Sequence, residues 1–204
     1  MITLFHSPGS CSNGLLLLLE EVGADYEVEV LPIIENAHRT ESYLALNPKG
    51  KIPALRLEDG TVLTEFQAIA QYIVDTHPEA GLAPADPVAR AQLCAAMDYI
   101  VASQHMRGYS FIKRPARFVE DPAAHEAISA HGHEQVAQTS ALISDMLGDQ
   151  EYLLGDFSAA DTALYFTSRW ADGDGVTLPE NLAAHLERMR ARPSHVAVAH
   201  LMQR

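Results

Sequence analysis

An apolar strand, a sharp turn and a leucine-rich helix are encoded in residues 2–23, which read ITLFHSPGSCSNGLLLLLEEVG. The apolar run Ile2–Phe5 is followed closely by Ser7-Pro8-Gly9, a pattern that is typical of a buried strand ending in a turn. The leucine spacing then predicts a helix over Cys11–Val22, closed by Gly23, which suits the left-handed position after a helix. Because this helix is apolar on almost every side, we expect neighbouring elements to cover more than one of its faces.

Alternating strand and helix patterns continue up to residue 77. Strands are predicted at Tyr26–Leu31, Ile52–Leu57 and Thr61–Leu63, and a short helix is predicted at Glu41–Leu46. Thr64-Glu65-Phe66-Gln67 reads as a capping box in front of an apolar helical face, with Thr64 as the cap. The resulting order is βαβαββα, and the hairpin between the last two strands requires a mixed sheet.

The chain changes character at residues 77–87, where three prolines and a glycine predict a linker. Only helical patterns follow it: Pro87–Lys113, Pro122–Leu147, Ala159–Ala171, Asn181–Ala191 and Ser194–Met202. Ser158 and Asp161 supply the cap of the third of these helices. We therefore expect an α/β domain over residues 1–77, a linker over 78–86 and an all-helical domain over 87–204.

Charge and cysteine content narrow the class of protein. The 204 residues carry a formal net charge of −13, so we expect neither nucleic acid nor an anionic membrane as a partner. Two cysteines cannot build a disulfide framework, and they suit a reducing compartment. Residues 1–19 lack the basic start and the cleavage site of a signal peptide, and no window is apolar enough to span a membrane. We expect a cytoplasmic protein.

Cys11 is the strongest candidate for chemistry, because it stands where the first strand gives way to a helix. Unpaired N–H groups and the helix dipole favour a thiolate at such a position, or the sulfur anion of a bound ligand. The alternative is that Cys11 is a small buried apolar residue, and its position alone leaves both interpretations open. Cys94 lies in the middle of a helical pattern beside Leu93 and two alanines, which indicates a core residue.

Two further positions have both a functional and a structural interpretation. Ile52-Pro53 is either a cis peptide whose neighbouring backbone groups pair with an extended peptide, or an ordinary trans proline. Glu65, at a helix start, either binds a ligand ammonium beside N–H groups that take a carboxylate, or complements the helix dipole. Spacing alone favours the structural interpretation at both positions.

Histidines and basic residues of the second half suggest two more sites. One predicted helix carries three histidines, which are His125, His131 and His133. No cysteine or paired carboxylate completes a metal site with them, so we expect solvated side chains and no metal. A basic stretch without an acid includes Arg107, Lys113, Arg114 and Arg117. A solvated face is the default interpretation of this stretch, and attraction of an anionic ligand is the alternative.

Four motifs occur in the order and spacing of cytosolic glutathione S-transferases: Pro8-Gly9-Ser10-Cys11-Ser12, Asn47-Pro48-Lys49-Gly50-Lys51-Ile52-Pro53-Ala54-Leu55, Leu63-Thr64-Glu65 and Phe157-Ser158-Ala159-Ala160-Asp161. The whole chain resembles this family, and the cysteine after Pro-Gly-Ser is most similar to the bacterial beta class. The resemblance implies a thioredoxin-like α/β domain, an all-α second domain and a homodimer.

The resemblance also implies where the co-substrate glutathione lies. Ile52 would pair its backbone with the cysteinyl unit, before a cis Pro53. Glu65 and the N–H of residue 66 would hold the γ-glutamyl end. The catalytic candidates are Cys11, close to the glutathione sulfur, and His105, near the thiol or the glycyl end. The full set of implied glutathione contacts is Ser10, Cys11, Arg39, Lys51, Ile52, Pro53, Glu65 and Phe66. The pocket for the second substrate is assigned to His105, Tyr109, Phe111, Tyr165 and Trp170.

The chain departs from the family's pattern at three places. Phe66 stands where a small residue is usual, and its place on an apolar helical face predicts that the ring packs inward and weakens binding without abolishing it. The segment before Asn47 is short, which leaves Arg39 as the counterpart of a basic residue that contacts the glycyl carboxylate. After His105 the register slips by one residue, at Met106.

Three functions fit these residues. The first is a detoxifying glutathione transferase that stabilises the glutathione thiolate for attack on small apolar electrophiles, with thiol–disulfide exchange through Cys11 or dehalogenation as variants. The second is a non-catalytic glutathione-binding or stress-regulatory protein of the same fold, for which Phe66 is the main argument. The third is a redox relay in which Cys11 is itself oxidised. The transferase is the function we expect.

Overall fold

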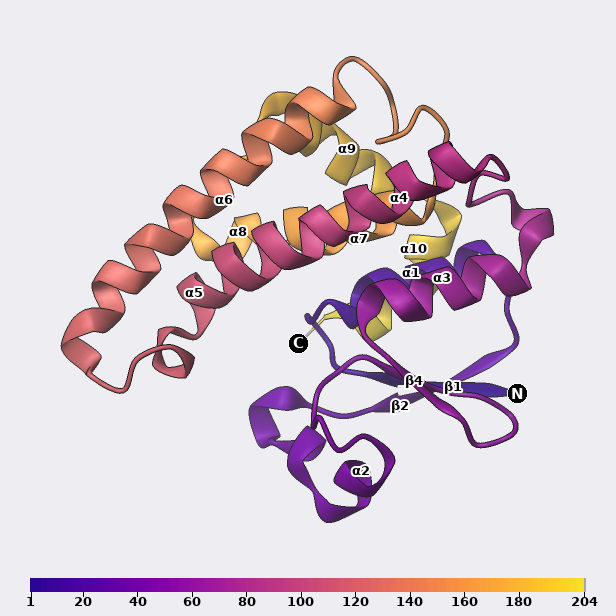
Figure 1. Cartoon of the computed structure of the whole chain (residues 1–204), viewed down its shortest axis with the longest axis horizontal. Helices are drawn as coiled ribbons and strands as arrows, with labels where there is room; N and C mark the ends of the chain where they lie inside the picture. The colour runs from indigo at the N-terminus through magenta and orange to yellow at the C-terminus, as the bar shows by residue number, and fades with distance from the viewer. Residues whose placement is uncertain (204) are drawn as a thin grey trace. The chain divides into compact units, whose positions relative to one another are not determined.

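The computed structural model describes residues 1–203, and these divide into two compact units (Figure 1). The first unit joins Met1–Ala83 to the chain from Arg190 onward, and the second unit spans Pro84–Met189. The end of the chain therefore belongs with its beginning, whereas residues 87–204 were expected to form one domain.

The last helix accounts for this difference. α10 (Pro193–Met202) packs against α1 (Ser12–Glu21). Just before α10, the Arg192 guanidinium binds the Glu21 carboxylate, with 2.5 Å between Nε and Oε1. Periodicity along the sequence identifies a helix but not its packing partner, so the helical pattern alone grouped α10 with the helices before it.

Among the described residues, the first unit contains a four-stranded mixed sheet with the strand order β2-β1-β3-β4. Its strands are β1 (Ile2–His6), β2 (Tyr26–Val30), β3 (Ala54–Arg56) and β4 (Val62–Thr64). β1 pairs in parallel with β2, whereas the pairs β1–β3 and β3–β4 are antiparallel. The predicted mixed sheet is confirmed, although β3 is shorter than the predicted Ile52–Leu57 and β4 lies one residue later than the predicted Thr61–Leu63.

Helices cover both faces of this sheet (Figure 1). Besides α10, the α-helices of the first unit are α1, α2 (Glu41–Leu46) and α3 (Phe66–Thr76). Leu15–Leu19 of α1 are fully buried, because β1, α3 and α10 all contact this helix. The expectation that several elements cover α1 is therefore confirmed. On the other face, the Tyr43 ring of α2 packs against Phe5, with ring centroids 5.4 Å apart.

The second unit is built from helices. They are α4 (Pro87–Tyr99), a π-helical segment (Ile100–Tyr109), α5 (Ser110–Lys113), α6 (His125–Leu147), α7 (Ala159–Ser168), α8 (Ala171–Asp174) and α9 (Glu180–Arg190). Glycine allows α6 to approach α5 closely, since a Cβ on Gly132 would lie 2.9 Å from the Ile112 nitrogen. None of the helices within residues 1–203 is both long and apolar enough to cross a membrane.

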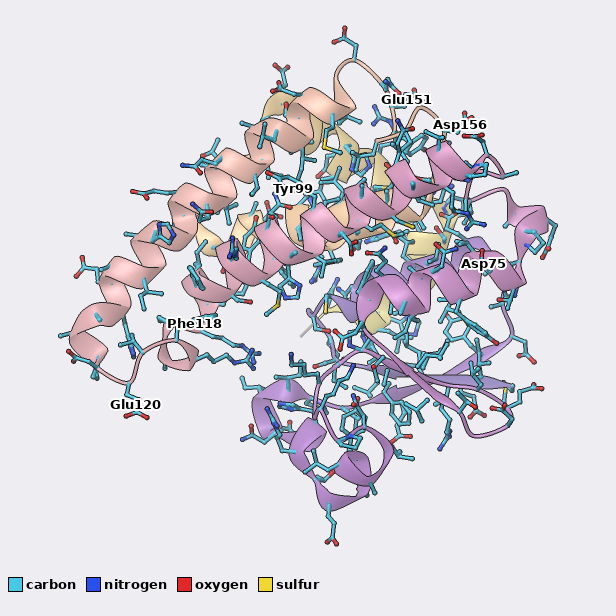
Figure 2. The ribbon with its side chains drawn as sticks, viewed as in Figure 1. Asp75, Tyr99, Phe118, Glu120, Glu151 and Asp156 are labelled. Atoms are coloured by element: carbon cyan, nitrogen blue, oxygen red, sulfur yellow. The ribbon has the colours of Figure 1, made fainter. Side chains whose placement is uncertain are left out.

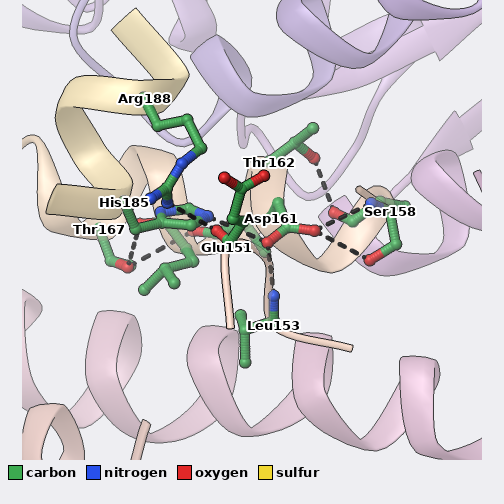
Figure 3. A network of polar contacts seen from close by, with 11 residues as sticks. Glu151, Leu153, Ser158, Asp161, Thr162, Thr167, His185 and Arg188 are labelled. Atoms are coloured by element: carbon green, nitrogen blue, oxygen red, sulfur yellow. Dashed lines mark hydrogen bonds and ion pairs between the residues drawn. The ribbon is translucent and has the colours of Figure 1, made fainter. Parts of the chain in front are cut away.

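A buried carboxylate organises the start of α7 (Figure 3). Asp161 accepts hydrogen bonds from the Ser158 backbone N–H at 2.9 Å, from the Ser158 hydroxyl at 3.1 Å and from the Leu153 N–H at 2.9 Å. The His185 Nε2 of α9 lies 3.0 Å from the same carboxylate and must donate, because carboxylate oxygens accept. The predicted capping role of Ser158 and Asp161 is confirmed. The carboxylate also ties α7 to α9.

Candidate functional site

The segment between β1 and α1 forms the first part of the site. Gly9 adopts φ +77°, and the Ser10 N–H donates to the Ser7 carbonyl at 3.0 Å. This turn places Cys11 at the N-cap position of α1, in agreement with the prediction. Cys11 is 8% exposed, and its Sγ lies 3.8 Å from the Ile52 carbonyl oxygen. The sulfur therefore lies at the positive end of a helix dipole, where a thiolate is stabilised.

A chain of hydrogen bonds links this turn to β1. Ser12 Oγ lies 2.8 Å from His6 Nδ1, and His6 Nε2 lies 2.9 Å from the Leu201 carbonyl oxygen. Because a carbonyl oxygen accepts, His6 Nε2 carries a proton. Ser12 Oγ also lies 2.7 Å from Ser10 Oγ and 3.3 Å from the Ser7 carbonyl oxygen. Ser12 therefore joins the turn to the last residue of β1.

The C-terminal end of α10 holds the same turn. The Gly9 N–H donates to the Met202 carbonyl at 3.1 Å, and the Asn13 side-chain amide donates to that oxygen at 3.2 Å. Together with the bond from His6 to the Leu201 carbonyl, this gives three donors around Cys11 that meet the last turn of one helix. Sequence reasoning missed these contacts, because their partners are separated by almost the whole chain.

The peptide bond Ile52-Pro53 is cis, as the resemblance implied. The Lys51 carbonyl just before it accepts from the Tyr43 hydroxyl at 2.6 Å and from the Asn47 amide at 2.9 Å. These two buried side chains fix the segment that leads to β3. Cys11, Ile52 and Pro53 are therefore brought together, as predicted.

Glu65 links β4 to α3 and has an unusual backbone conformation, with φ +74° and ψ 133°. Among the described residues its side chain makes no capping bond, and α3 begins at Phe66. The predicted capping box headed by Thr64 is therefore wrong. Thr64 pairs with Ala54 across the β3–β4 ladder and stays extended, so the change of direction falls on Glu65 instead.

Lys49 is a charged residue of the site that sequence reasoning did not assign. Its Nζ lies 2.7 Å from Glu65 Oε1 and 2.8 Å from the Thr64 hydroxyl. The residue belongs to the motif around Asn47, but one sequence does not tell which side of a turn a lysine faces. The structure thus places a lysine ammonium on the acid expected to bind a ligand ammonium.

Arg39 and Phe66 occupy opposite environments. The Arg39 side chain covers Gly50, where an added Cβ would lie 2.8 Å from Nη1, so this arginine borders the turn of residues 47–51. Phe66 is only 4% exposed and shares its buried face with Ile69 and Ile73. The prediction that the ring packs inward is confirmed. The aromatic side chain belongs to the core, and only its backbone lies at the helix start.

An aromatic cluster in the second unit contains three residues of the expected second-substrate pocket. The Trp170 ring lies 4.9 Å from the His105 ring and 5.3 Å from the Tyr109 ring, centroid to centroid. Phe166, which was not predicted, lies 5.2 Å from Trp170. Burial raises the pKa of Tyr109, and the charges of Asp174 and Asp172 raise it further, so the phenol stays protonated.

Phe111 and Tyr165 are the other two pocket candidates. Phe111 packs edge-on against Phe118 at 4.4 Å and lies 5.9 Å from the His131 ring. Tyr165 is almost fully buried in α7. Phe118 projects from the segment that joins α5 to α6 (Figure 2). Phe111 therefore belongs to a second aromatic group of the same unit.

A π-helical segment over Ile100–Tyr109 carries His105. In a π-helix the N–H bonds to the carbonyl five residues earlier, so one turn holds more residues than an α-helical turn. Met106, where the sequence slips by one residue against the family's pattern, lies in the same π-helical segment. Gly108 belongs to the same segment. A larger residue would not fit there, because a Cβ would lie 2.6 Å from the Val136 side chain.

The histidines and basic residues of this unit have mainly structural contacts. His133 lies 3.0 Å from both the Ser129 and the Asp174 carbonyl oxygens, so it is not simply solvated. Lys113 pairs with the Asp174 carboxylate at 2.5 Å, so the basic stretch is not free of acidic partners. Within residues 1–203, three or more potential ligands nowhere gather into a metal site.

The described residues combine a mixed sheet, a cysteine at the start of the first helix, a cis-proline before the third strand and a helical unit. This combination defines a protein with a thioredoxin-like unit and an all-helical unit. The family profile described as "Glutathione S-transferase, N-terminal domain" matches residues 9–76. The chain is also 32% identical over 195 residues to glutathione S-transferase GstA of Escherichia coli O157:H7, which covers 93% of each chain. The protein therefore belongs to the glutathione S-transferase family.

Solved structures agree with this assignment. A glutathione transferase homologue from Sulfitobacter, solved with bound glutathione, is 36% identical, covers 98% of this chain and 97% of its own, and superposes with a TM-score of 0.91. A bacterial beta-class transferase from Sphingomonas chungbukensis is 29% identical, covers 98% of each chain and has a TM-score of 0.85. The resemblance that the sequence motifs indicated is confirmed.

Proposed function

We propose that this protein is a glutathione transferase that binds glutathione on its first unit and activates the glutathione thiol for attack on a small apolar electrophile. One observation carries the proposal: the Cys11 sulfur lies at the positive end of α1 and 3.8 Å from the carbonyl oxygen that precedes the cis-proline. The glutathione bound to the Sulfitobacter homologue supports the same co-substrate for this chain.

Each part of glutathione has a chemically suited partner. The backbone of Ile52 pairs with the cysteinyl unit as a neighbouring strand would. Glu65 binds the γ-glutamyl ammonium, and the N–H of Phe66 at the start of α3 binds the adjacent carboxylate. Ser10 supplies backbone contacts. Lys51 belongs to the turn of residues 47–51 and Arg39 borders it. Both provide positive charge for the glycyl carboxylate.

The chemistry requires a thiolate. Helix-terminal N–H groups and the dipole of α1 lower the free energy of the glutathione sulfur anion, which attacks carbon in the electrophile while the leaving group departs with its electron pair. Because Cys11 lies at the same helix end, its own thiolate attacks a glutathione mixed disulfide. That attack transfers glutathione to Cys11 and releases the other thiol.

The second unit carries the candidates for binding the second substrate. His105 serves as the second catalytic candidate. Its ring cluster with Tyr109 and Trp170 is the part of the second unit that we assign to the electrophile. A second copy of the chain covers the open apolar hollow beside Tyr99, which lies between α4 and α6 (Figure 2). Leu142 and Met146 border this hollow and are 53% and 40% exposed, which supports a homodimer. The protein acts in the cytoplasm, in detoxification.

Two substrates separate the variants of this function. Wild-type protein and Cys11→Ala are assayed with glutathione and a model aryl halide, and with a glutathione mixed disulfide. Conjugation that persists in Cys11→Ala supports transferase chemistry in which glutathione is the only nucleophile. Activity on the mixed disulfide alone, lost in Cys11→Ala, supports thiol exchange. Glutathione binding without turnover of either substrate contradicts the proposal and supports a binding protein.

A further inference from the structure

We propose that Lys49 is the internal counter-ion of Glu65, and that the ammonium of an incoming ligand must replace it. Lys49 then sets how tightly the site binds glutathione. This inference rests on the proposed function, because Glu65 is the residue assigned there to the γ-glutamyl ammonium. It adds a residue that competes with the ligand from within the chain.

The contacts are those of an ammonium site that is already occupied. Lys49 Nζ lies 2.7 Å from Glu65 Oε1 and 2.8 Å from the Thr64 hydroxyl oxygen, and both atoms accept hydrogen bonds. A lysine side chain and the amino end of a peptide both carry a primary ammonium with three N–H donors. Lys49 therefore occupies the acceptors that a ligand ammonium requires.

The backbone of Lys49 is held while its side chain can leave. The Lys49 N–H donates to the Asn47 side-chain oxygen at 3.2 Å, and the Gly50 N–H donates to the Asn47 carbonyl at 2.9 Å. The side chains of Lys49 and Glu65 are 51% and 59% exposed. Exchange of the lysine for a ligand thus requires rotation of one solvated side chain and no change in the turn.

The strength of the pair determines the size of the effect. Exposed ion pairs are weak, because water screens the charges and ordering two long side chains costs entropy. A variant without the lysine ammonium lacks this pair in the free protein, whereas in the complex the pair is already broken. Ligand binding then no longer has to break it, so the affinity improves by about 1.5- to 5-fold. The gain depends on the ligand ammonium. A ligand without that group leaves Lys49 paired with Glu65 and gains nothing.

The test is titration calorimetry of the full chain with glutathione and with deaminated glutathione, in which hydrogen replaces the γ-glutamyl amino group. Lys49→Met should bind glutathione about 1.5- to 5-fold more tightly than the wild type and deaminated glutathione with unchanged affinity. Lys49→Arg keeps the charge and should match the wild type. In a Glu65→Gln background, Lys49→Met should have no effect. Thermal melts establish that each variant is folded.

The outcomes separate the two proposals. An unchanged or weakened affinity of folded Lys49→Met for glutathione overturns the inference, and weakening would mean that Lys49 binds the ligand carboxylate instead. An equal gain for deaminated glutathione also overturns it, since the gain would then be a general charge effect. If the wild type releases no heat and shows no binding with glutathione, the proposed function itself fails.

Discussion

Glu65 has a strained backbone conformation, since its φ of +74° lies where residues with a side chain are rarely found. Such conformations cost on the order of 1–3 kcal/mol and persist where the surrounding structure enforces them. Here the pairing of Thr64 in β4 and the start of α3 at Phe66 leave Glu65 to make the turn. The strained turn places Glu65 directly before the first residue of α3.

Replacement of Glu65 separates strain from charge. Glu65→Gly relieves the backbone strain and should raise the free energy of unfolding by about 1 kcal/mol, while glutathione affinity falls because the carboxylate is lost. Glu65→Gln keeps the strain and loses the pair with Lys49, so its unfolding free energy should fall by no more than about 1 kcal/mol. Urea denaturation and calorimetry measure the two quantities. Equal stability of both variants would argue against strain at this position.

At the scale of single elements, α7 depends on one carboxylate. Asp161 and His185 are fully buried, and the carboxylate accepts from two backbone N–H groups, a hydroxyl and the His185 ring. A buried acceptor with four partners cannot be removed without leaving donors unpaired. The Asp161 carboxylate therefore holds the N-terminal end of α7 and the packing of α9 against it.

Asp161→Ala should therefore lower the free energy of unfolding by about 3–5 kcal/mol, as measured by urea denaturation. Asp156→Ala is the matched control, because Asp156 is an exposed aspartate a few residues earlier (Figure 2). Its effect should stay within about 0.5 kcal/mol. A small effect of Asp161→Ala would show that water replaces the carboxylate at α7.

The close contact between α5 and α6 depends on Gly132, which has no side chain. Gly132→Ala places a Cβ 2.9 Å from the Ile112 backbone nitrogen, so the helices must separate. We expect a loss of about 1–3 kcal/mol in unfolding free energy, although alanine favours helices. Gly173→Ala in α8 is the control, because nothing lies within 4 Å of its Cβ position. That variant should be neutral or stabilised by up to about 1 kcal/mol in the same urea experiment.

At the scale of the whole molecule, the end of the chain stabilises its beginning. Burial raises the pKa of Glu21, but hydrogen bonds from Arg192 and Ser194 and the charge of Arg192 outweigh it, so the net shift is downward. A carboxyl whose pKa is lower in the folded state contributes stability above its unfolded pKa. That contribution is lost as the pH falls through the folded value.

Glu21→Gln should lower the free energy of unfolding by about 1–3 kcal/mol at neutral pH. The difference from the wild type should shrink as the pH falls below the ordinary pKa of glutamate, because the wild-type carboxyl is then protonated as well. Urea denaturation of both proteins across this pH range measures it. A difference independent of pH would mean that Glu21 acts through packing, and a difference that grows in acid would contradict the sign of the shift.

Local patterns predicted most elements, since strand alternation, helical spacing and turn residues act over a few neighbours. The strands, α1, α2 and α7 fall where these patterns lie, and Cys11 is located at its helix start. The capping box at Thr64 failed because ladder pairing, a non-local contact, decided the conformation of Thr64. The π-helical segment around His105 was not predicted, because the sequence pattern indicated one helix over Pro87–Lys113.

The sequence by itself determined the βαβαββα order, the helical second half and the position of the cysteine, because hydrophobic periodicity and turn chemistry are local. Only the tertiary structure decided that α10 holds the Cys11 turn through the carbonyls of residues 201 and 202. It likewise decided that Lys49 pairs with Glu65. These contacts join residues far apart in the chain. Their geometry depends on packing of the whole unit, which no short stretch of residues encodes.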